Sequence, residues 1–542
     1  MDKQLSKSIE YLRKSIHLVW MLYLFALVGI FPLYLDLRTG YQKIDVDKFH
    51  FFKVTSLWTV GCFIILLFCG ALLHLIKWYK NRGCISLAPG ILLVRSMQRL
   101  SYTDLFVLFY AFSLLISYGL SSYCQTASIG AEGWYMGLFP QLMFVGIYLI
   151  TSRLLTSKEI RLLGYTMLAA SFLVFLLAIL NRYGIDPLKT GLGDPGFLST
   201  IGNINWLCGY WSTVFPLGCG LFWLKQRKAF ESSLIYSLKW VFLGLYIAVG
   251  ISAAITQGSE SGVFTLISLI LLMGWIAGKN HLQFISFFKL LFFFSTTLIL
   301  LQIVHLFLPD ANTLPTPLYN RLMGTFSVWV IAGLIFVFLF FLQSKLWGQK
   351  SFFFLNKVWK GGVVLATLFL ILYVILVIAN TLNPGVLGSF SNYPAFWFDE
   401  NWGNARGGTW KAGLSTWLSQ DLLHKLTGAG PDAMSAYIYS GKNSALLHSV
   451  LNQFGQHTLT NAHNEWITVL ADLGLLGLFS FIGMMISSII RFVKSRKPWC
   501  IAFAFCLLSY TINNMFSFQQ LMNISQMFVL LGMGEAIARK IQ

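Results

Sequence analysis

Long apolar runs alternate with short polar segments along most of the chain. A helix of about 20 apolar residues spans the hydrocarbon core of a bilayer, and fourteen runs approach that length. They cover residues 17–35, 54–75, 105–121, 137–154, 162–183, 206–224, 240–256, 261–277, 290–306, 327–342, 363–379, 466–490, 498–516 and 521–537. The pattern predicts an all-α polytopic membrane protein with about 14 transmembrane helices.

One connection is much longer than the others. Residues 380–463 separate the eleventh run from the twelfth, and loops of this length usually carry a function. The pattern therefore divides the chain into helices 1–11 within residues 1–379, a long helical loop at 380–463, and helices 12–14 within residues 464–542.

The long loop contains helical signals of its own. In "GTWKAGLSTWLSQDLLHKL", Trp410, Leu414 and Trp417 share one stripe of a helix, and most of the polar residues lie elsewhere. Such a helix lies in the membrane interface or packs on the rest of the loop. Further on, Pro431 followed by Asp432 predicts another helix start. The loop is therefore expected to form a structured cap.

The composition supports this interpretation. Hydrophobic residues make up 56% of the chain and charged residues 11%, with a mean hydropathy of +0.69, whereas soluble domains carry about 25% charged residues. The first apolar run has no cleavage signal after it and is expected to be retained. Most of the eight cysteines fall inside apolar runs, and Cys124 alone falls in an external connection, so no disulfide framework is predicted.

The net charge of +19 is explained by orientation in the membrane. Most of the 39 Lys and Arg residues fall in alternate connections that share the side of both termini. Because cytoplasmic loops are enriched in Lys and Arg, both termini are predicted to be cytoplasmic and residues 380–463 extracytoplasmic. Basic residues arranged in this way do not indicate a nucleic-acid partner.

His463 is the strongest candidate for acid–base chemistry. It lies in the polar cluster "TNAHNEW" at the external mouth of the twelfth run, where a neutral imidazole can take a proton from a hydroxyl. A histidine at this place is also a common interfacial residue, so its position alone leaves both readings open. Glu465 and Asp472 are seven residues apart on one helix face, which is expected to point away from His463.

Two external arginines are candidates for binding phosphate. Arg406 lies beside two glycines in the long loop, and Arg321 lies in the external "LYNRLMGTF". A guanidinium can bind a phosphate through two hydrogen bonds, although it can also reach the interface merely to stay hydrated. The spacings of His448, His457 and His463 match no familiar set of metal ligands, so neither a metal nor a cofactor is predicted.

Three segments resemble a known family. "NAHNEWITVLADLGLLGL" resembles the histidine motif of the O-antigen ligase/polymerase superfamily of bacterial membrane glycosyltransferases. "RGGTWKAGLSTWLSQDLLHKLTGAGPDAM" resembles its Arg-x-x-x-Trp run with a Gly-x-Gly-Pro turn, and "STIGNINWLCGYWSTVFPL" resembles its Gly-Asn-x-Asn span. The resemblance covers about residues 195–490, with the three segments in family order.

The resemblance implies an enzyme of the bacterial cytoplasmic membrane with its active site on the extracytoplasmic face. Such enzymes move a glycan from undecaprenyl pyrophosphate to the hydroxyl of a glycan or lipid-glycan acceptor, without a metal. By this analogy His463 is the general base, and Arg406 binds the pyrophosphate. The substrate-binding residues it implies are Arg321, Asn203, Asn205, Trp410, Gly428, Gly430, Asp432, Asn464 and Glu465.

One position departs from the family pattern. Many members carry an arginine after a Thr-Gln-Ser turn, whereas here "TQGSESG" puts Glu260 near that place. A carboxylate does not bind a diphosphate as an arginine does. Arg321 or another basic residue is expected to take this part.

Three functions follow from these observations. The first is an O-antigen ligase-like enzyme, and the second is a polymerase whose acceptor is another lipid-linked repeat unit. The third is a flippase for lipid-linked oligosaccharides. The long loop and His463 favour an enzyme, because a coupled transporter would be expected to carry a buried acidic relay.

Overall fold

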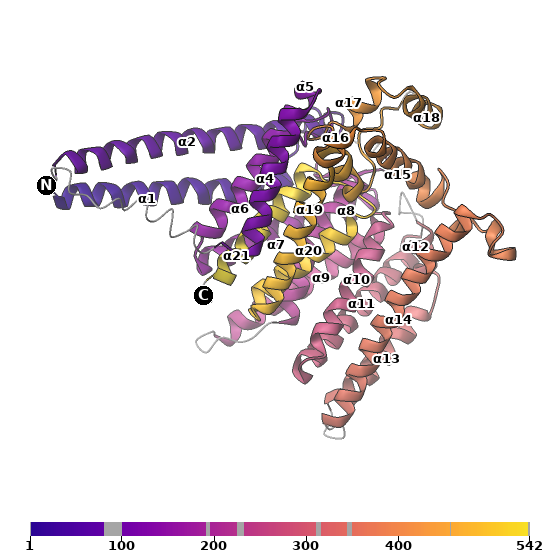
Figure 1. Cartoon of the computed structure of the whole chain (residues 1–542). Coiled ribbons are helices and arrows are strands. Elements are labelled where there is room, and N and C mark those ends of the chain that lie inside the picture. Colours follow the sequence, from indigo (N-terminus) through magenta and orange to yellow (C-terminus); the bar gives the residue numbers. More distant parts are fainter. Residues whose placement is uncertain are drawn as a thin grey trace.

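A computed structural model of the protein describes residues 2–80, 100–190, 194, 196–224, 232–309, 316–343, 349–455 and 457–539. The described chain is almost entirely helical (Figure 1). The elements of the first half are α1 (Asp2–Phe25), η1 (Ala26–Ile30), η2 (Phe31–Leu33), α2 (Ile44–Lys80), α4 (Tyr102–Leu120), α5 (Cys124–Ile129), α6 (Leu138–Leu154), α7 (Ser157–Arg182), β1 (Phe197–Leu198), β2 (Gly202–Asn203), α8 (Ile204–Trp223), α9 (Ser233–Thr256) and α10 (Ser261–Ala277).

The elements of the second half are α11 (His281–Phe307), α12 (Pro317–Met323), α13 (Ser327–Gln343), α14 (Gln349–Leu382), η3 (Gly388–Asn392), η4 (Pro394–Phe396), α15 (Trp402–Leu418), α16 (Leu422–Thr427), α17 (Met434–Tyr439), α18 (Ser444–Phe454), α19 (Glu465–Lys494), α20 (Pro498–Asn513) and α21 (Leu521–Arg539). The two short strands β1 and β2 form an antiparallel pair directly before α8.

Each predicted apolar run contains a helix. In the described part of the chain, nine helices are long and apolar enough to cross a membrane, and α6, α10, α13 and α20 are apolar but shorter. The chain is therefore an all-α, multi-pass membrane protein. The segments 81–99, 225–231 and 344–348, which supply part of the predicted cytoplasmic charge, lie outside the described residues.

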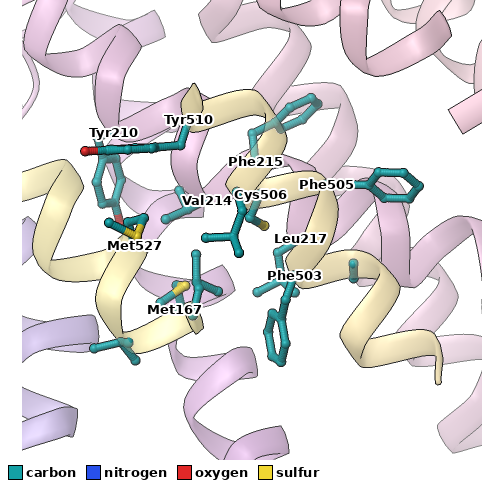
Figure 2. Packing of buried hydrophobic residues seen from close by; sticks show 14 of the residues in the cluster. Met167, Tyr210, Val214, Phe215, Leu217, Phe503, Phe505, Cys506, Tyr510 and Met527 are labelled. Carbon is teal, nitrogen blue, oxygen red and sulfur yellow. The ribbon is translucent and has the colours of Figure 1, made fainter. Parts of the chain in front are cut away.

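The core of the bundle is built around α8 and α20. Small residues allow close helix contact: a side chain at Gly218 would enter the ring of Tyr246, and one at Gly220 would meet Ala502. Figure 2 shows Cys506 of α20 beside Val214 of α8. The α8 helix is buried along nearly its whole length, so it is fixed from all sides.

Two pairs of helices lie at the edges of the bundle. The α1 and α2 helices run side by side and project from it, and α13 and α14 lie at another edge (Figure 1). Only a small share of the apolar part of α2 and α14 is buried in protein. Their apolar faces suit contact with acyl chains.

The two ends of the bundle differ. Residues 383–463 cover one end, which is called the loop end below. At the opposite end, the tail end, α21 finishes beside the start of α4, where Arg539 pairs with Asp104. The candidate residues His463 and Arg406 belong to the loop end.

The loop is helical, but its helices differ in detail from the prediction. The predicted helix over 408–426 is divided into α15 and α16, because Asp421 accepts a hydrogen bond from the His424 N–H and caps a new helix. The helix expected from Pro431 begins at Met434 instead, because Asp432 has a left-handed backbone (φ 55°). The α15 helix packs along α19.

The α19 helix is broken where the loop docks on it. Gly474 has φ 65° and ψ −165°, a conformation that is essentially restricted to glycine. The break frees two carbonyl groups, and the glycine turn after α16 satisfies them: Ala429 N–H donates to Ala471 and Gly430 N–H donates to Asp472. Gly428 lies so close to Asp472 that a side chain there would clash. The loop and the broken helix therefore form one unit.

Candidate functional site

His463 lies directly before α19, outside the helix. Its φ of 49° is unusual for a non-glycine residue, and its N–H donates to Asn461 Oδ1 at 3.0 Å. The imidazole packs edge-on against Phe518, with ring centroids 4.9 Å apart. Its Nδ1 is buried and has no hydrogen-bond partner among the described residues. Burial and the charge of Arg406 lower the pKa of His463 to about 4, so the ring is neutral at physiological pH.

Arg406 projects from α15 and is half-buried. Its Nε donates to the Phe516 carbonyl at 2.9 Å, and Nη1 donates to the Gly403 carbonyl at 3.2 Å. Burial lowers the pKa of the guanidinium, while Glu260 and Cys208 counteract this shift. Arginine remains charged even so, because its usual pKa is very high. Arg406 is thus a cation held mainly by backbone carbonyls.

The connection between α20 and α21 joins these two side chains. It supplies the carbonyl of Phe516 to Arg406 and the ring of Phe518 to His463. Residues 57 apart in the sequence therefore meet over one short segment. The positive charge of Arg406 is close enough to His463 to lower its pKa.

Aromatic rings form a wall beside Arg406. Phe264 stacks on Phe516 with centroids 5.3 Å apart, and Trp410 lies 6.3 Å from Phe516 on a tilted plane. Trp410 also contacts Trp402 at 5.5 Å. The indole Nε1 of Trp410 is buried, and no partner for it occurs in the described part of the chain. An apolar wall of this kind limits the water that reaches the guanidinium.

The α9–α10 hairpin brings polar side chains to the same region. Ser259 Oγ donates to Asn205 Oδ1 at 3.3 Å and lies 3.1 Å from Ser261 Oγ. Ser261 in turn lies 3.4 Å from Cys208 Sγ. Glu260 is exposed on this hairpin. Both Glu260 and Cys208 act electrostatically on Arg406. This arginine therefore lies near the "TQGSESG" turn, which differs from the pattern of the family that the motifs resemble.

Arg182 is a buried arginine that the sequence interpretation missed. It ends α7, and its guanidinium donates to the carbonyls of Thr256 at 2.8 Å and Gln257 at 2.5 Å. Both polar atoms of the Gln257 amide are buried and without a partner in the described ranges. An arginine within the apolar run 162–183 was the signal, since ionisable residues inside membrane segments usually have a function.

Two predicted substrate-binding asparagines cap helices. Asn203 accepts a hydrogen bond from the Asn205 N–H at 2.8 Å and starts α8. Asn464 accepts from the Trp466 N–H at 3.0 Å and starts α19. The Asn464 amide also donates to the Met515 carbonyl at 3.0 Å, which ties α19 to the connection that carries Phe516 and Phe518. Their contact with a substrate stays a prediction.

Three buried carboxyl groups line a separate cavity with space for a few water molecules. They are Asp432 from the glycine turn, and Glu465 and Asp472 from α19. Glu465 accepts a hydrogen bond from the Gln519 N–H at 2.5 Å. His463 does not line this cavity, but Phe518 and Asn461, which both contact His463, do. None of these carboxyl groups is placed to orient its ring.

The carboxyl groups hold the loop on the bundle. Asp432 accepts backbone hydrogen bonds from Ala131 at 2.8 Å and Met136 at 3.0 Å, and Asp472 accepts one from Met434 at 2.7 Å. Burial raises the pKa of Asp432, because the charged form loses its hydration. The glycine turn is thereby fixed against both α19 and the segment before α6.

Arg321 lies in the connection between α11 and α13. It is exposed on α12, which packs against α9 and α11. The neighbouring Tyr319 hydroxyl lies 3.2 Å from the hydroxyl of Tyr183. Among the predicted phosphate-binding arginines, Arg406 is the one that the structure brings to His463.

The arrangement offers a defined set of chemical properties. A half-buried guanidinium can bind an anion, and a neutral imidazole with an unpaired nitrogen can accept a proton. Within the described residues, no three His, Cys, Asp or Glu side chains come together as a metal site. No protein-family model and no curated protein matches this chain.

Proposed function

We propose that the chain is an O-antigen ligase-like glycosyltransferase. It moves a glycan from undecaprenyl pyrophosphate to an acceptor hydroxyl at the loop end of the bundle. The observation that carries the proposal is the meeting of Arg406 and His463 over residues 516–518. The resemblance of the motifs around these two residues points in the same direction.

The chemistry needs one base and one cation. The acceptor oxygen attacks the anomeric carbon, and the bond from that carbon to the pyrophosphate oxygen breaks. The leaving lipid pyrophosphate takes the bonding electrons, and its new negative charge is stabilised by Arg406. The acceptor proton passes to the imidazole of His463, which is neutral before the reaction. Attack from the face opposite the leaving group inverts the anomeric centre.

The proposed topology has fourteen membrane-spanning helices and both termini in the cytoplasm. The apolar helices in each predicted run and the distribution of Lys and Arg support it. It places the loop end on the extracytoplasmic side of the bacterial cytoplasmic membrane. This is the side on which glycans carried by undecaprenyl pyrophosphate are transferred in the family that the motifs resemble.

A reconstitution assay separates the possible functions. The purified protein is placed in liposomes with a labelled lipid-linked repeat unit, first alone and then with a lipid-glycan acceptor. Transfer only when the acceptor is present is the expected result. Chain growth on the repeat unit alone would assign a polymerase instead. Movement of the label across the bilayer without a new glycosidic bond would assign a flippase and contradict the proposal.

A further inference from the structure

A groove between α4 and α19 opens towards the tail end of the bundle, far from His463. Its walls are apolar, and its volume is about 630 Å³. Tyr102 and Phe106 of α4 form one wall, while Phe479, Ile482 and Ile486 of α19 form the other. The groove is independent of the proposed function.

The groove faces the hydrocarbon part of the membrane. Along α19, Phe479 is 61% exposed, Ile486 is 54% exposed and Ile490 is 47% exposed. Because α19 is long and apolar enough to cross a membrane, these side chains are open to acyl chains rather than to water. An acyl chain lying along them would bury this apolar surface.

Basic residues close the tail end of the groove. Arg491 and Lys494, in the last turn of α19, both line it, together with Ser487 and Ser495. Arg491 donates from Nε to Glu535 at 2.8 Å, but its Nη2 is buried without a partner in the described residues. Glu535 therefore satisfies only part of this guanidinium.

The local charge balance also favours an anion. Two buried carboxylates, Asp104 and Glu535, are shared among three arginines, Arg153, Arg491 and Arg539. This network has one positive charge more than it has negative charges. Lys494 lies beside it, exposed at the mouth of the groove, and adds to the excess.

We propose that this groove binds an anionic phospholipid from the leaflet at the tail end. Its acyl chain lies along Phe479, Ile486 and Ile490, and its phosphate is held by Arg491 and Lys494. A soluble phosphate would leave the apolar walls uncovered, whereas a neutral lipid would leave the excess positive charge uncompensated. An anionic lipid satisfies both parts of the groove.

The test measures which lipids stay bound to the full chain. The protein is placed in nanodiscs of equal parts phosphatidylglycerol and phosphatidylcholine, and the retained lipids are counted by native mass spectrometry. Retention of phosphatidylglycerol over phosphatidylcholine is expected. Lys494→Glu changes the charge by two units and should lower that preference about 30-fold, since each unit of charge near a lipid surface contributes about 1 kcal/mol. Arg496→Glu makes the same charge change at an exposed residue outside the groove and should leave the preference intact.

Two further arms test the acyl-chain part. Ile486→Trp fills the groove and should abolish retention, and Leu475→Trp, at an exposed position elsewhere on α19, should not. Soluble glycerol phosphate should fail to displace the bound lipid. Equal retention of both lipids, equal effects of Lys494→Glu and Arg496→Glu, or displacement by glycerol phosphate would each overturn the proposal. Because Lys494 is exposed, its variant is expected to fold.

Discussion

His463 combines a fixed ring with an unusually acidic imidazolium. The contact with Phe518 and the backbone bond to Asn461 hold the residue in place. Its folded pKa of about 4 lies below the usual value near 6.5. Between these two values the unfolded chain binds a proton that the folded chain does not, so His463 lowers the stability as pH falls from 6.5 to 4.

The shifted pKa of His463 predicts how the rate of glycan transfer falls at low pH. If His463 is the base, glycan transfer by the wild type should persist below pH 6.5 and fall only as pH approaches 4. Replacing Phe518 with Ala exposes the imidazole to water and should move the pH at which the rate falls towards 6.5. Initial rates measured across the pH range with a lipid-pyrophosphate donor provide the check. An acid limb near 6.5 in the wild type would contradict the assignment.

The sequence predicts His463 and Arg406 as candidate site residues, but it does not predict the contacts that hold them. His463 stands out as a polar residue at the edge of an apolar run, and Arg406 stands out as an arginine beside two glycines in the long loop. Phe518 does not stand out, because it is one aromatic residue in an aromatic-rich chain. Arg182 is a charge within the apolar run 162–183 and carries a signal, but the sequence does not reveal its partners. Their roles depend on contacts between segments that are distant in sequence.

At the scale of the element, the broken α19 helix is the central feature. It exposes carbonyl groups inside the bundle, and the glycine turn of the loop satisfies them. The docking of the loop is therefore built into a membrane helix. This explains why the loop that carries Arg406 keeps a fixed position relative to His463.

Replacing Gly474 with Ala tests the break. A side chain there would meet the Leu426 backbone, and its backbone conformation is unfavourable for alanine. We expect a loss of about 1–3 kcal/mol in the free energy of unfolding. Gly146→Ala in α6 is the matched control, because its side chain would meet open space. Thermal unfolding of both variants in the same detergent provides the comparison, and equal melting temperatures would contradict this account.

Asp432 links loop docking to pH. Its folded pKa, raised by burial to about 7, lies above the usual value near 3.8. Such a group contributes stability that is fully present below pH 3.8 and is lost as pH rises through about 7. Proteolysis of the loop should thus become faster above pH 7. Asp432→Asn, which cannot ionise, should remove this rise, and an unchanged pH dependence in the variant would rule out Asp432 as its cause.

The helices could be predicted from the sequence because each is an apolar run of distinctive length. The break in α19 could not, because "ADLGLLGL" continues the apolar pattern on both sides of Gly474. Only the glycine turn near Gly428, 46 residues earlier, makes the break favourable. The division of the predicted 408–426 helix could have been predicted, since aspartate, here Asp421, is a common residue at the N-cap of a helix.

At the scale of the whole molecule, the proposed orientation assigns the loop end to the extracytoplasmic side of the membrane. Cys124 is exposed at that end, on the short α5 helix. A membrane-impermeant thiol reagent should label it in intact cells, and Cys124→Ser should remove that label. Labelling of Cys124 only after the membrane is permeabilised would reverse the proposed orientation.

The central claim is that Arg406 and His463 form one catalytic pair at the loop end. The most direct measurement is the rate of glycan transfer from a labelled undecaprenyl-pyrophosphate donor by the reconstituted wild type, His463→Ala and Arg406→Ala. Lys411, on the same helix as Arg406, forms an exposed ion pair with Glu400, which precedes the helix, and Lys411→Ala is the control. Both site variants are expected to insert and fold normally yet lose at least about 100-fold in rate, while the control stays active. Wild-type rates in His463→Ala and Arg406→Ala would contradict it.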